Sequence, residues 1–420
     1  MQLTIPYHKT SLPLRIPKTH HVDIILPHEE PVLTDPDTLI LNALENPVAS
    51  PHLRDIIQPG NTISIIVSDS TRTTPTNIML PPLLDMLLCA DAQEQNITII
   101  YALGIHRRQS EQEQVAIVGQ DIYQKYQCID HDKDRCQYIG TTSRGTRVEV
   151  FEQVVRSDVI ICTGSIEYHY FAGYTGGYKA ILPGVSSYRS IMANHGLMIR
   201  DGTSPGNYNC PVRSDMEEAG SIFGVDFILN VVLNSKKQIT GAAAGHPVHA
   251  HRVGTQTVDD MYKQSIEPAD IVIVSPGGWP KDIDLFQSHK ALEHVKSAIR
   301  PGGSVILVAH CLEGTGNEVF DKWMNMGYLP EEIISRLEQE FILGGHKAAL
   351  LAKLALEFDM YLVSGLTQQT AKKAYFNGGL SLQQAFDKVS DKYGPDAGVV
   401  VVPYGTSTLV EKENGAKQLP

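Results

Sequence analysis

Residues 158–195 decide the fold of this chain and have the sequence DVIICTGSIEYHYFAGYTGGYKAILPGVSSYRSIMANH. The stretch opens with an apolar run typical of a buried strand, and the rest leaves the carboxyl end of that strand, where open α/β sheets build their sites. Glycines that allow close approach of a ligand alternate there with a candidate base, a candidate amine nucleophile and a candidate metal ligand: Gly173, Gly176, Gly177, Gly184, His169, Lys179 and His195. Each residue alone fits an ordinary surface loop, but the combination indicates a site.

The same strand-to-turn pattern occurs earlier in the chain. The β-branched run 62–67 predicts a strand that ends in the hydroxyl-rich turn SDSTRTTP, residues 68–75. Pro75 suits the start of a helix that continues to Leu88, so Arg72 falls close to a helix amino terminus, where anions bind well. An ordinary capping turn with Arg72 in a surface salt bridge explains this segment equally well.

A third strand is expected at residues 96–102, followed by the short turn LGIHRR. Ser110 and Glu113 form a capping box, which fixes the start of the next helix and confines His106 to the turn. His106 therefore shares an edge of the predicted sheet with Arg72.

Strands and helices alternate through the rest of the chain, which predicts an α/β fold of mainly parallel, helix-flanked sheets. A hairpin is expected before residue 30, a glycine- and alanine-rich turn before Gly245, and later strands at 269–274, 304–309, 360–364 and 398–403. With 420 residues the chain is too long for one ordinary core. We expect a larger domain at 1–265, completed by 405–420, and a smaller domain at 266–404.

The composition of the chain argues against several classes of function. The formal net charge of −12 argues against broad binding to nucleic acid or to an anionic membrane. Six scattered cysteines without a CxxC pair fit a reducing compartment. The amino terminus lacks the pattern of a signal peptide, and no apolar run has the length of a membrane span, so a soluble cytoplasmic protein is expected.

Polar side chains follow apolar strands in both predicted domains. If the carboxyl-terminal edges of the two predicted sheets face each other, these side chains line an interdomain cleft, the usual place for a small-molecule site. The residues concerned are Arg72, His106, His169, Lys179, His195, Gln287 and Lys290. Other histidines, including His246, His249 and His251, are expected at the surface. Two classes of protein compete on this pattern: a Schiff-base lyase built on Lys179, and a non-catalytic carboxylate-binding protein. Nicotinamide dinucleotide binding is disfavoured because no strand-to-helix turn has the pattern GxGxxG.

Four motifs resemble those of the lactate racemase family, which uses a nickel-pincer nucleotide. They are SDSTRTTP at 68–75, LGIHR at 103–107, HYFAGYTGGYKAILPGVSSY at 169–188 with NH at 194–195, and GGWPKDIDLFQSHKAL at 277–292. The resemblance covers essentially the whole chain. It implies an isomerase with two α/β domains and an active site in the cleft between them.

The resemblance also implies a role for each motif residue. Lys179 resembles the lysine that carries a pyridinium-3-thioamide-5-thiocarboxylate mononucleotide, and His195 the protein ligand of nickel, whose other donors are two sulfurs and a ring carbon of that cofactor. His106 and His169 resemble the acid/base pair. The remaining positions would contact the cofactor (Asp69, Ser70, Thr71, Arg72, Gln287 and Lys290) or the substrate carboxylate (Arg72 and Lys290).

The implied reaction interconverts the enantiomers of a 2-hydroxy acid. One histidine takes the hydroxyl proton while the α-hydrogen leaves as hydride, and the transient 2-keto acid is reduced on its other face. Lactate is the expected substrate, and malate, aryl or longer aliphatic lactates and sugar acids remain alternatives. Side-chain recognition would fall to Tyr168, Tyr170, Trp279 and Phe286, which fit aromatic packing equally well. The expected partners are the 2-hydroxy acid and the enzymes that make the cofactor, with no nucleic acid and no membrane.

Overall fold

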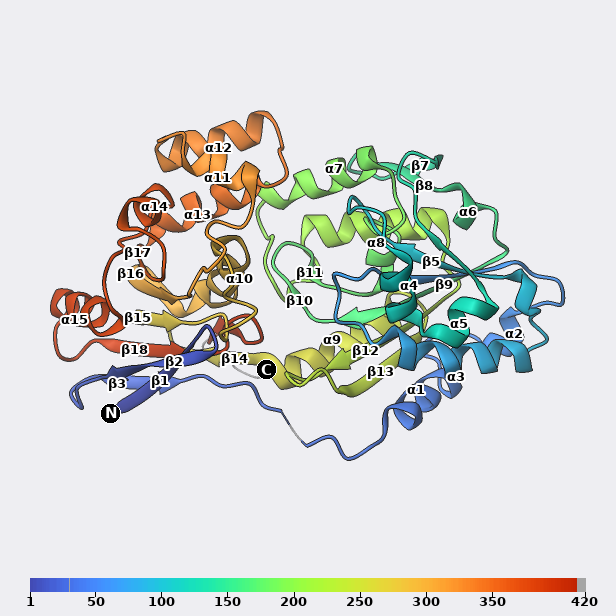
Figure 1. Cartoon of the computed structure of the whole chain (residues 1–420), viewed down its shortest axis with the longest axis horizontal. Coiled ribbons are helices and arrows are strands. Elements are labelled where there is room, and N and C mark those ends of the chain that lie inside the picture. Colours follow the sequence, from blue (N-terminus) through green and yellow to red (C-terminus); the bar gives the residue numbers. More distant parts are fainter. Residues whose placement is uncertain (30, 414–420) are drawn as a thin grey trace, which may run out of the picture. The chain divides into compact units, whose positions relative to one another are not determined.

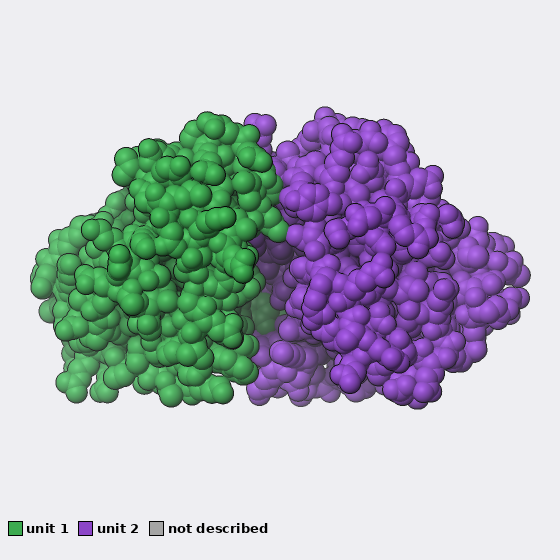
Figure 2. All heavy atoms as spheres, turned by 45° about the horizontal axis from the view of Figure 1, so that its top comes forward, with its two compact units in different colours: residues 1–28, 261–420 green, residues 29–260 purple. Residues whose placement is uncertain are grey.

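The computed structural model describes residues 1–29 and 31–413, which divide into two compact units. Unit 1 comprises residues 1–28 and 261–420, and unit 2 comprises residues 29–260 (Figure 2). Both have helices flanking a mainly parallel sheet (Figure 1), which confirms the predicted fold class. None of the helices among the described residues combines the length and apolar character that crossing a bilayer requires.

Unit 2 is built on a six-stranded sheet with the order β13-β12-β9-β4-β5-β6. All neighbouring strands are parallel except β12 and β13. In chain order its elements are α1 (Pro36–Glu45), α2 (Leu53–Ile56), β4 (Ile63–Ser68), α3 (Thr76–Cys89), η1 (Glu94–Asn96), β5 (Ile97–Ala102), α4 (Glu111–Val118), α5 (Gln120–Lys125), β6 (Gln127–Asp130), β7 (Cys136–Thr141), β8 (Arg147–Phe151), α6 (Glu152–Val155), β9 (Val159–Ile166), β10 (Tyr168–His169), β11 (Gly173–Tyr174), η2 (Gly177–Ala180), α7 (Tyr188–Gly196), η3 (Leu197–Ile199), α8 (Pro211–Phe223), β12 (Phe227–Leu233), β13 (Ile239–Gly245) and α9 (His249–Tyr262).

The central strands of this sheet are buried along almost their whole length, as β-branched runs in parallel sheets usually are. Ile65, Ile99 and Ile161 pack into one core with Leu44 of α1 and Leu83 of α3. Because β4, β5 and β9 are parallel, the turns that follow them leave the same edge of the sheet. This edge carries the predicted site residues of unit 2.

Unit 1 contains a five-stranded parallel sheet with the order β17-β16-β15-β18-β3. A two-stranded hairpin packs its residues Ile5 and Leu14 into the same core as Ile273 and Phe386. In chain order the elements are β1 (Gln2–Tyr7), β2 (Thr10–Arg15), β3 (His21–Ile24), β14 (Lys263–Ile266), β15 (Ala269–Val274), α10 (Leu285–Val295), η4 (Lys296–Ala298), β16 (Ile299–Val308), α11 (Glu318–Met324), α12 (Pro330–Gln339), α13 (Gly345–Glu357), β17 (Asp359–Val363), α14 (Gln368–Lys373), α15 (Leu382–Tyr393), β18 (Gly398–Val402) and β19 (Leu409–Lys412).

Three features differ from the sequence predictions. The expected amino-terminal hairpin is present, but residues 1–28 belong with the second half of the chain because β3 pairs with β18. Residues 405–413 also fall in unit 1, where β19 pairs with β14, rather than completing the other domain; residues 414–420 lie outside the described part. The segment ending at Gly245 is not a turn but the strand β13, antiparallel to β12. In all three cases the position of the segment is determined by backbone hydrogen bonding to a segment distant in the chain. Local sequence patterns do not predict such pairing.

Candidate active site

The first pair of predicted site residues is joined directly. Asp69 follows β4 and His106 lies in the turn after β5, and the His106 Nδ1 atom is 2.5 Å from the Asp69 carboxylate. Thr71 donates a second hydrogen bond to Asp69 through its hydroxyl at 2.7 Å. Burial by itself would raise the pKa of Asp69, but the hydrogen bonds from His106 and Thr71 outweigh it and hold the pKa below its usual range. The carboxylate therefore stays ionised and fixes the Nδ1 proton of His106, which leaves Nε2 of the neutral ring to accept a proton.

The rest of this turn is exposed. Ser70, Thr71 and Arg72 have exposed side chains, and the Arg72 backbone N–H closes the turn on the Asp69 carbonyl at 3.1 Å. Arg72 forms no ion pair within residues 1–29 and 31–413. An exposed guanidinium without an acidic partner suits the capture of an anion such as a carboxylate.

The second histidine sits on a small hairpin. His169 on β10 pairs with Gly173 on β11, and its Nδ1 atom accepts a hydrogen bond from the Ala172 backbone N–H at 3.3 Å. Phe171 packs edge-on against the imidazole with ring centroids 4.4 Å apart. Since Nδ1 is an acceptor, the proton of the neutral ring lies on Nε2. In this neutral form His169 can donate a hydrogen bond through Nε2.

Lys179 lies in η2, which follows the hairpin, and its side chain is partly exposed. Burial of the amine, and after it the positive charges of Arg72 and Arg213, hold the pKa of Lys179 well below its usual range. Lowering this pKa favours the neutral amine, which is the nucleophilic form of a lysine.

His195 lies near the end of α7 and is only 8% exposed. Burial, and after it the charge of Lys179, lower the pKa of His195 to about 3, so the imidazole is neutral at physiological pH. Its Nδ1 atom is buried without a hydrogen-bond partner. A buried acceptor is rarely left unpaired, and a neutral imidazole nitrogen in this state suits a metal ion. No group of three or more histidine, cysteine or acidic residues within the described part of the chain is arranged to hold a metal ion.

These residues form one neighbourhood within unit 2. The His169 ring contacts Phe171, whose ring lies 4.9 Å from that of His195. The charge of Lys179 acts on His195, and the charges of Arg72 and Asp69 act on Lys179 in turn. Unit 2 therefore brings together the predicted residues of the first three motifs.

Gln287 and Lys290 belong to unit 1, where both lie on α10 with partly exposed side chains. The Asp284 side chain caps this helix by accepting the Gln287 backbone N–H at 2.6 Å. Their contribution to a site shared by the two domains stays a prediction.

Three buried side chains that the sequence did not single out support the Lys179 turn: Arg213, Asn230 and His251. Asn230 accepts the Gly177 N–H at 2.8 Å, and His251 Nε2 lies 2.8 Å from the Thr175 carbonyl. The prediction of a surface position for His251 was wrong, because α9 turns this residue toward the glycine turn. The only sequence signal for Arg213 is its place among apolar residues of one helix face, which is weak.

The aromatic residues proposed for side-chain recognition differ in environment. Tyr168 is buried, and its hydroxyl donates to Asp259 at 3.0 Å, so it packs within unit 2. Trp279 in unit 1 is 49% exposed, with the Lys9 amine 4.9 Å from its ring centroid.

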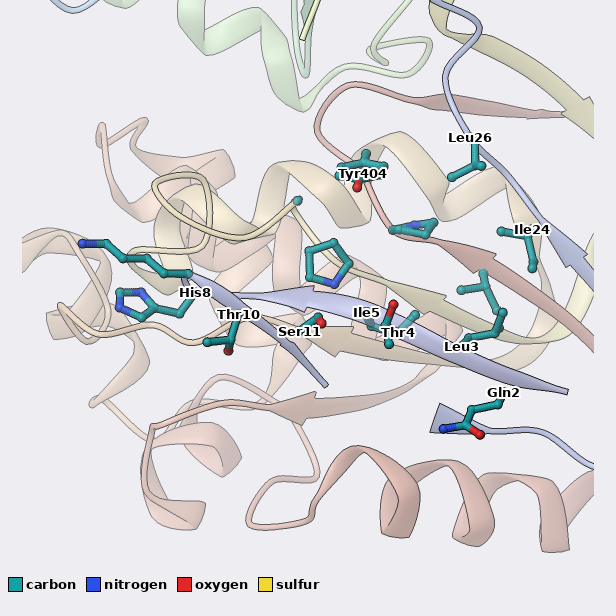
Figure 3. A pocket seen from close by; sticks show the side chains of 15 residues that line it. Gln2, Leu3, Thr4, Ile5, His8, Thr10, Ser11, Ile24, Leu26 and Tyr404 are labelled. Carbon is teal, nitrogen blue, oxygen red and sulfur yellow. The ribbon is translucent and has the colours of Figure 1, made fainter. Parts of the chain in front are cut away.

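A cavity of about 710 Å³ lies elsewhere, in unit 1 (Figure 3). It is lined by the amino-terminal hairpin, by Ile24 and Leu26, and by Tyr404 after β18. None of the predicted site residues lines it.

Gly184 shows how tightly the Lys179 turn is packed. A Cβ atom at this position would lie 2.0 Å from the Ala180 carbonyl oxygen, which belongs to η2. We expect Gly184→Ala to lower the free energy of unfolding by about 1–3 kcal/mol, as overpacking usually does. Urea denaturation measures this effect. Gly164→Ala is the control because its Cβ would come no closer than 3.6 Å to a neighbour, and equal stability of the two variants would contradict the packing.

The fold and these contacts define an α/β enzyme whose candidate site is lined by lysine and histidine. Residues 7–205 match the lactate racemase N-terminal domain, and residues 264–410 match the lactate racemase C-terminal domain. The chain therefore belongs to the lactate racemase family and is an isomerase.

Individual relatives agree with this assignment. The lactate racemase of Thermoanaerobacterium thermosaccharolyticum is 32% identical over 98% of this chain and 99% of its own length. That of Lactiplantibacillus plantarum is 29% identical over 97% of this chain and 99% of its own. The structure of the Thermoanaerobacterium lactate racemase apoprotein superposes with a TM-score of 0.91 at 31% identity, covering 98% of this chain and 100% of the other. A Thermotoga maritima protein shares the fold alone, with a TM-score of 0.65 at 17% identity over 93% of this chain and 100% of the other.

Proposed function

We propose that this chain racemises lactate with a nickel-pincer nucleotide, the pyridinium-3-thioamide-5-thiocarboxylate mononucleotide, held covalently on Lys179. The observation that carries the proposal is the pairing of Lys179, a lysine with a depressed pKa, with His195, a buried histidine whose Nδ1 has no partner. Two lactate racemases that match this chain over nearly their full length support lactate as the substrate.

The residues present fit this cofactor. The neutral amine of Lys179, which burial favours, is the form that can be acylated. His195 would hold the nickel through one neutral imidazole nitrogen, and the cofactor would supply sulfur and carbon donors. When bound, the cofactor supplies a hydride acceptor, so the very weakly acidic α-hydrogen of the substrate never has to leave as a proton.

The two histidines handle the hydroxyl proton. His106 accepts this proton at Nε2, because Asp69 holds Nδ1 and stabilises the imidazolium that results. His169 would return a proton to the other face in its imidazolium form, because the neutral imidazole is too weak an acid to give up its N–H proton. Their roles exchange when the reaction runs in the other direction, as a reversible racemisation requires. Arg72 would hold the substrate carboxylate with its exposed guanidinium.

A chiral assay tests the substrate. The protein is produced together with the cofactor-biosynthesis enzymes and offered single enantiomers of lactate, malate, aryl and longer aliphatic lactates and a sugar acid. Racemisation of lactate above the other acids is expected. Selective turnover of another acid would replace lactate, and turnover of none would overturn the proposal. The cytoplasmic location and the contact with the biosynthesis enzymes stay predictions.

Isotope incorporation tests the route. Lactate racemised in D₂O should contain no deuterium at C2, because a hydrogen that moves as hydride does not exchange with solvent. Deuterium at C2 in proportion to turnover would show removal of a proton and would contradict the proposed route.

Asp69→Asn tests the pairing with His106. An asparagine amide can donate to Nδ1 and reverse the tautomer of His106, so we expect kcat to fall about 100-fold while the KM for lactate changes little. Steady-state kinetics in both directions measure this effect, with the exposed Asp121→Asn as control. Wild-type kcat in Asp69→Asn would exclude a role for this contact in proton transfer.

A further inference from the structure

Arg213 on α8 is a fully buried cation whose partners are all backbone carbonyls. Its Nε donates to Ala172 at 3.1 Å, its Nη1 donates to Gly176 at 3.2 Å, and its Nη2 donates to Tyr174. Burial lowers its pKa to about 10, which leaves the guanidinium charged at neutral pH. Burying a charge without a carboxylate partner is costly, so such a residue is expected to have a specific task.

The acid whose charge acts on Arg213, Glu217, makes no hydrogen bond to it among the described residues. Glu217 lies one turn further along α8, and both its oxygens accept from Arg252 at 2.8 Å. Arg252 also lies 2.9 Å from His251 Nδ1, and none of the carbonyls bound by Arg213 is its partner. Arg252 therefore offers a matched comparison in the same cluster.

The three carbonyls belong to the segment that carries two site residues. Ala172 and Tyr174 lie in the hairpin that presents His169, and Gly176 precedes η2, which presents Lys179. Gly176 has a φ of +77°, which turns the chain sharply between the two parts. The planar fork of one guanidinium thus joins the hairpin to the turn.

The other groups of this segment are held by different partners. The Gly173 carbonyl accepts from Gly206 at 3.0 Å, and the Thr175 carbonyl lies 2.8 Å from His251 Nε2. The arginine alone spans both ends of the segment, from residue 172 to residue 176.

We propose that Arg213 is a positioning residue that sets the geometry of His169 relative to Lys179. This inference rests on the proposed function, which gives those two residues their roles. A lysine at this position keeps the charge but has no planar fork, so it cannot hold all three carbonyls in the observed geometry.

Hydrogen–deuterium exchange tests the geometry without cofactor or substrate. In the apoprotein of Arg213→Lys, amides of residues 168–180 should exchange about tenfold faster than in the wild type, and those of the rest of unit 2 should be unchanged. Arg252→Lys is the control and should leave residues 168–180 at the wild-type rate. Unchanged exchange of these amides in Arg213→Lys would overturn the proposal, whatever the substrate of the enzyme.

Kinetics of the cofactor-loaded protein test the consequence. We expect Arg213→Lys to lower kcat up to about 100-fold, as small misplacements of reacting groups do, with little change in the KM for lactate because Arg72 is untouched. Intact mass should show the adduct on a smaller share of molecules. Wild-type kcat and adduct level in Arg213→Lys, or an equal loss in Arg252→Lys, would also overturn the proposal. A wild-type protein that racemises no 2-hydroxy acid would refute the proposed function instead, and the exchange experiment would still decide the role of Arg213.

Discussion

Replacing Lys179 with alanine is expected to give a folded protein that carries no adduct and racemises no lactate. The amine is the only covalent anchor proposed for the cofactor, so the whole enzymatic acceleration, about a million-fold at the low end for enzymes, should be lost. The variant should still fold, because burial disfavours the charged form of this amine and its removal takes no favourable charge from the folded protein. Intact mass, a chiral assay and thermal unfolding measure the three effects.

The control for this variant is Lys236→Ala, which removes an exposed lysine from the same unit. It should keep wild-type adduct and activity. Racemisation by Lys179→Ala at more than a trace of the wild-type rate would show that the cofactor is held elsewhere, or that the reaction does not use it.

His169→Gln should lower kcat/KM for lactate by about 10³- to 10⁴-fold, the upper part of the range for general acid–base catalysis. The loss should be the same from either enantiomer. The two enantiomers have equal free energies in solution, so the ratio of the two kcat/KM values equals one in any variant. The same reasoning applies to His106→Gln.

The matched control is His249→Gln, since His249 is exposed and begins α9. Progress curves from each enantiomer, followed by chiral chromatography, give both constants. Activity of His169→Gln within tenfold of the wild type would remove this residue from the proton-transfer path.

The sequence was sufficient where a local pattern determines the structure. The strands predicted at 62–67 and 96–102 are the neighbouring parallel strands β4 and β5, and the capping box of Ser110 and Glu113 begins α4 as predicted. Parallel neighbours place their following turns on one edge, which is why Arg72 and His106 were expected on the same edge of the sheet. Asp69, in the same turn as Arg72, lies within hydrogen-bond distance of His106.

Pairing between strands distant in the chain and contacts of buried polar side chains could not be predicted from the sequence. Nothing in residues 21–24 indicates that they complete the sheet of unit 1 beside β18. Histidine and arginine are residue types usually found at the surface. His251 and Arg213 are nevertheless buried, because backbone carbonyls of the glycine turn accept hydrogen bonds from them. Such contacts depend on the directions in which the backbone carbonyls of residues 172–176 point. A local sequence pattern does not specify these directions.

The most direct test of the central claim is intact-mass and metal analysis of the protein co-produced with the enzymes that make the cofactor. The account predicts a covalent adduct that peptide mapping places on Lys179, with a stoichiometric amount of nickel that His195→Ala removes. A folded protein that racemises lactate without any adduct on Lys179 and without nickel would contradict it.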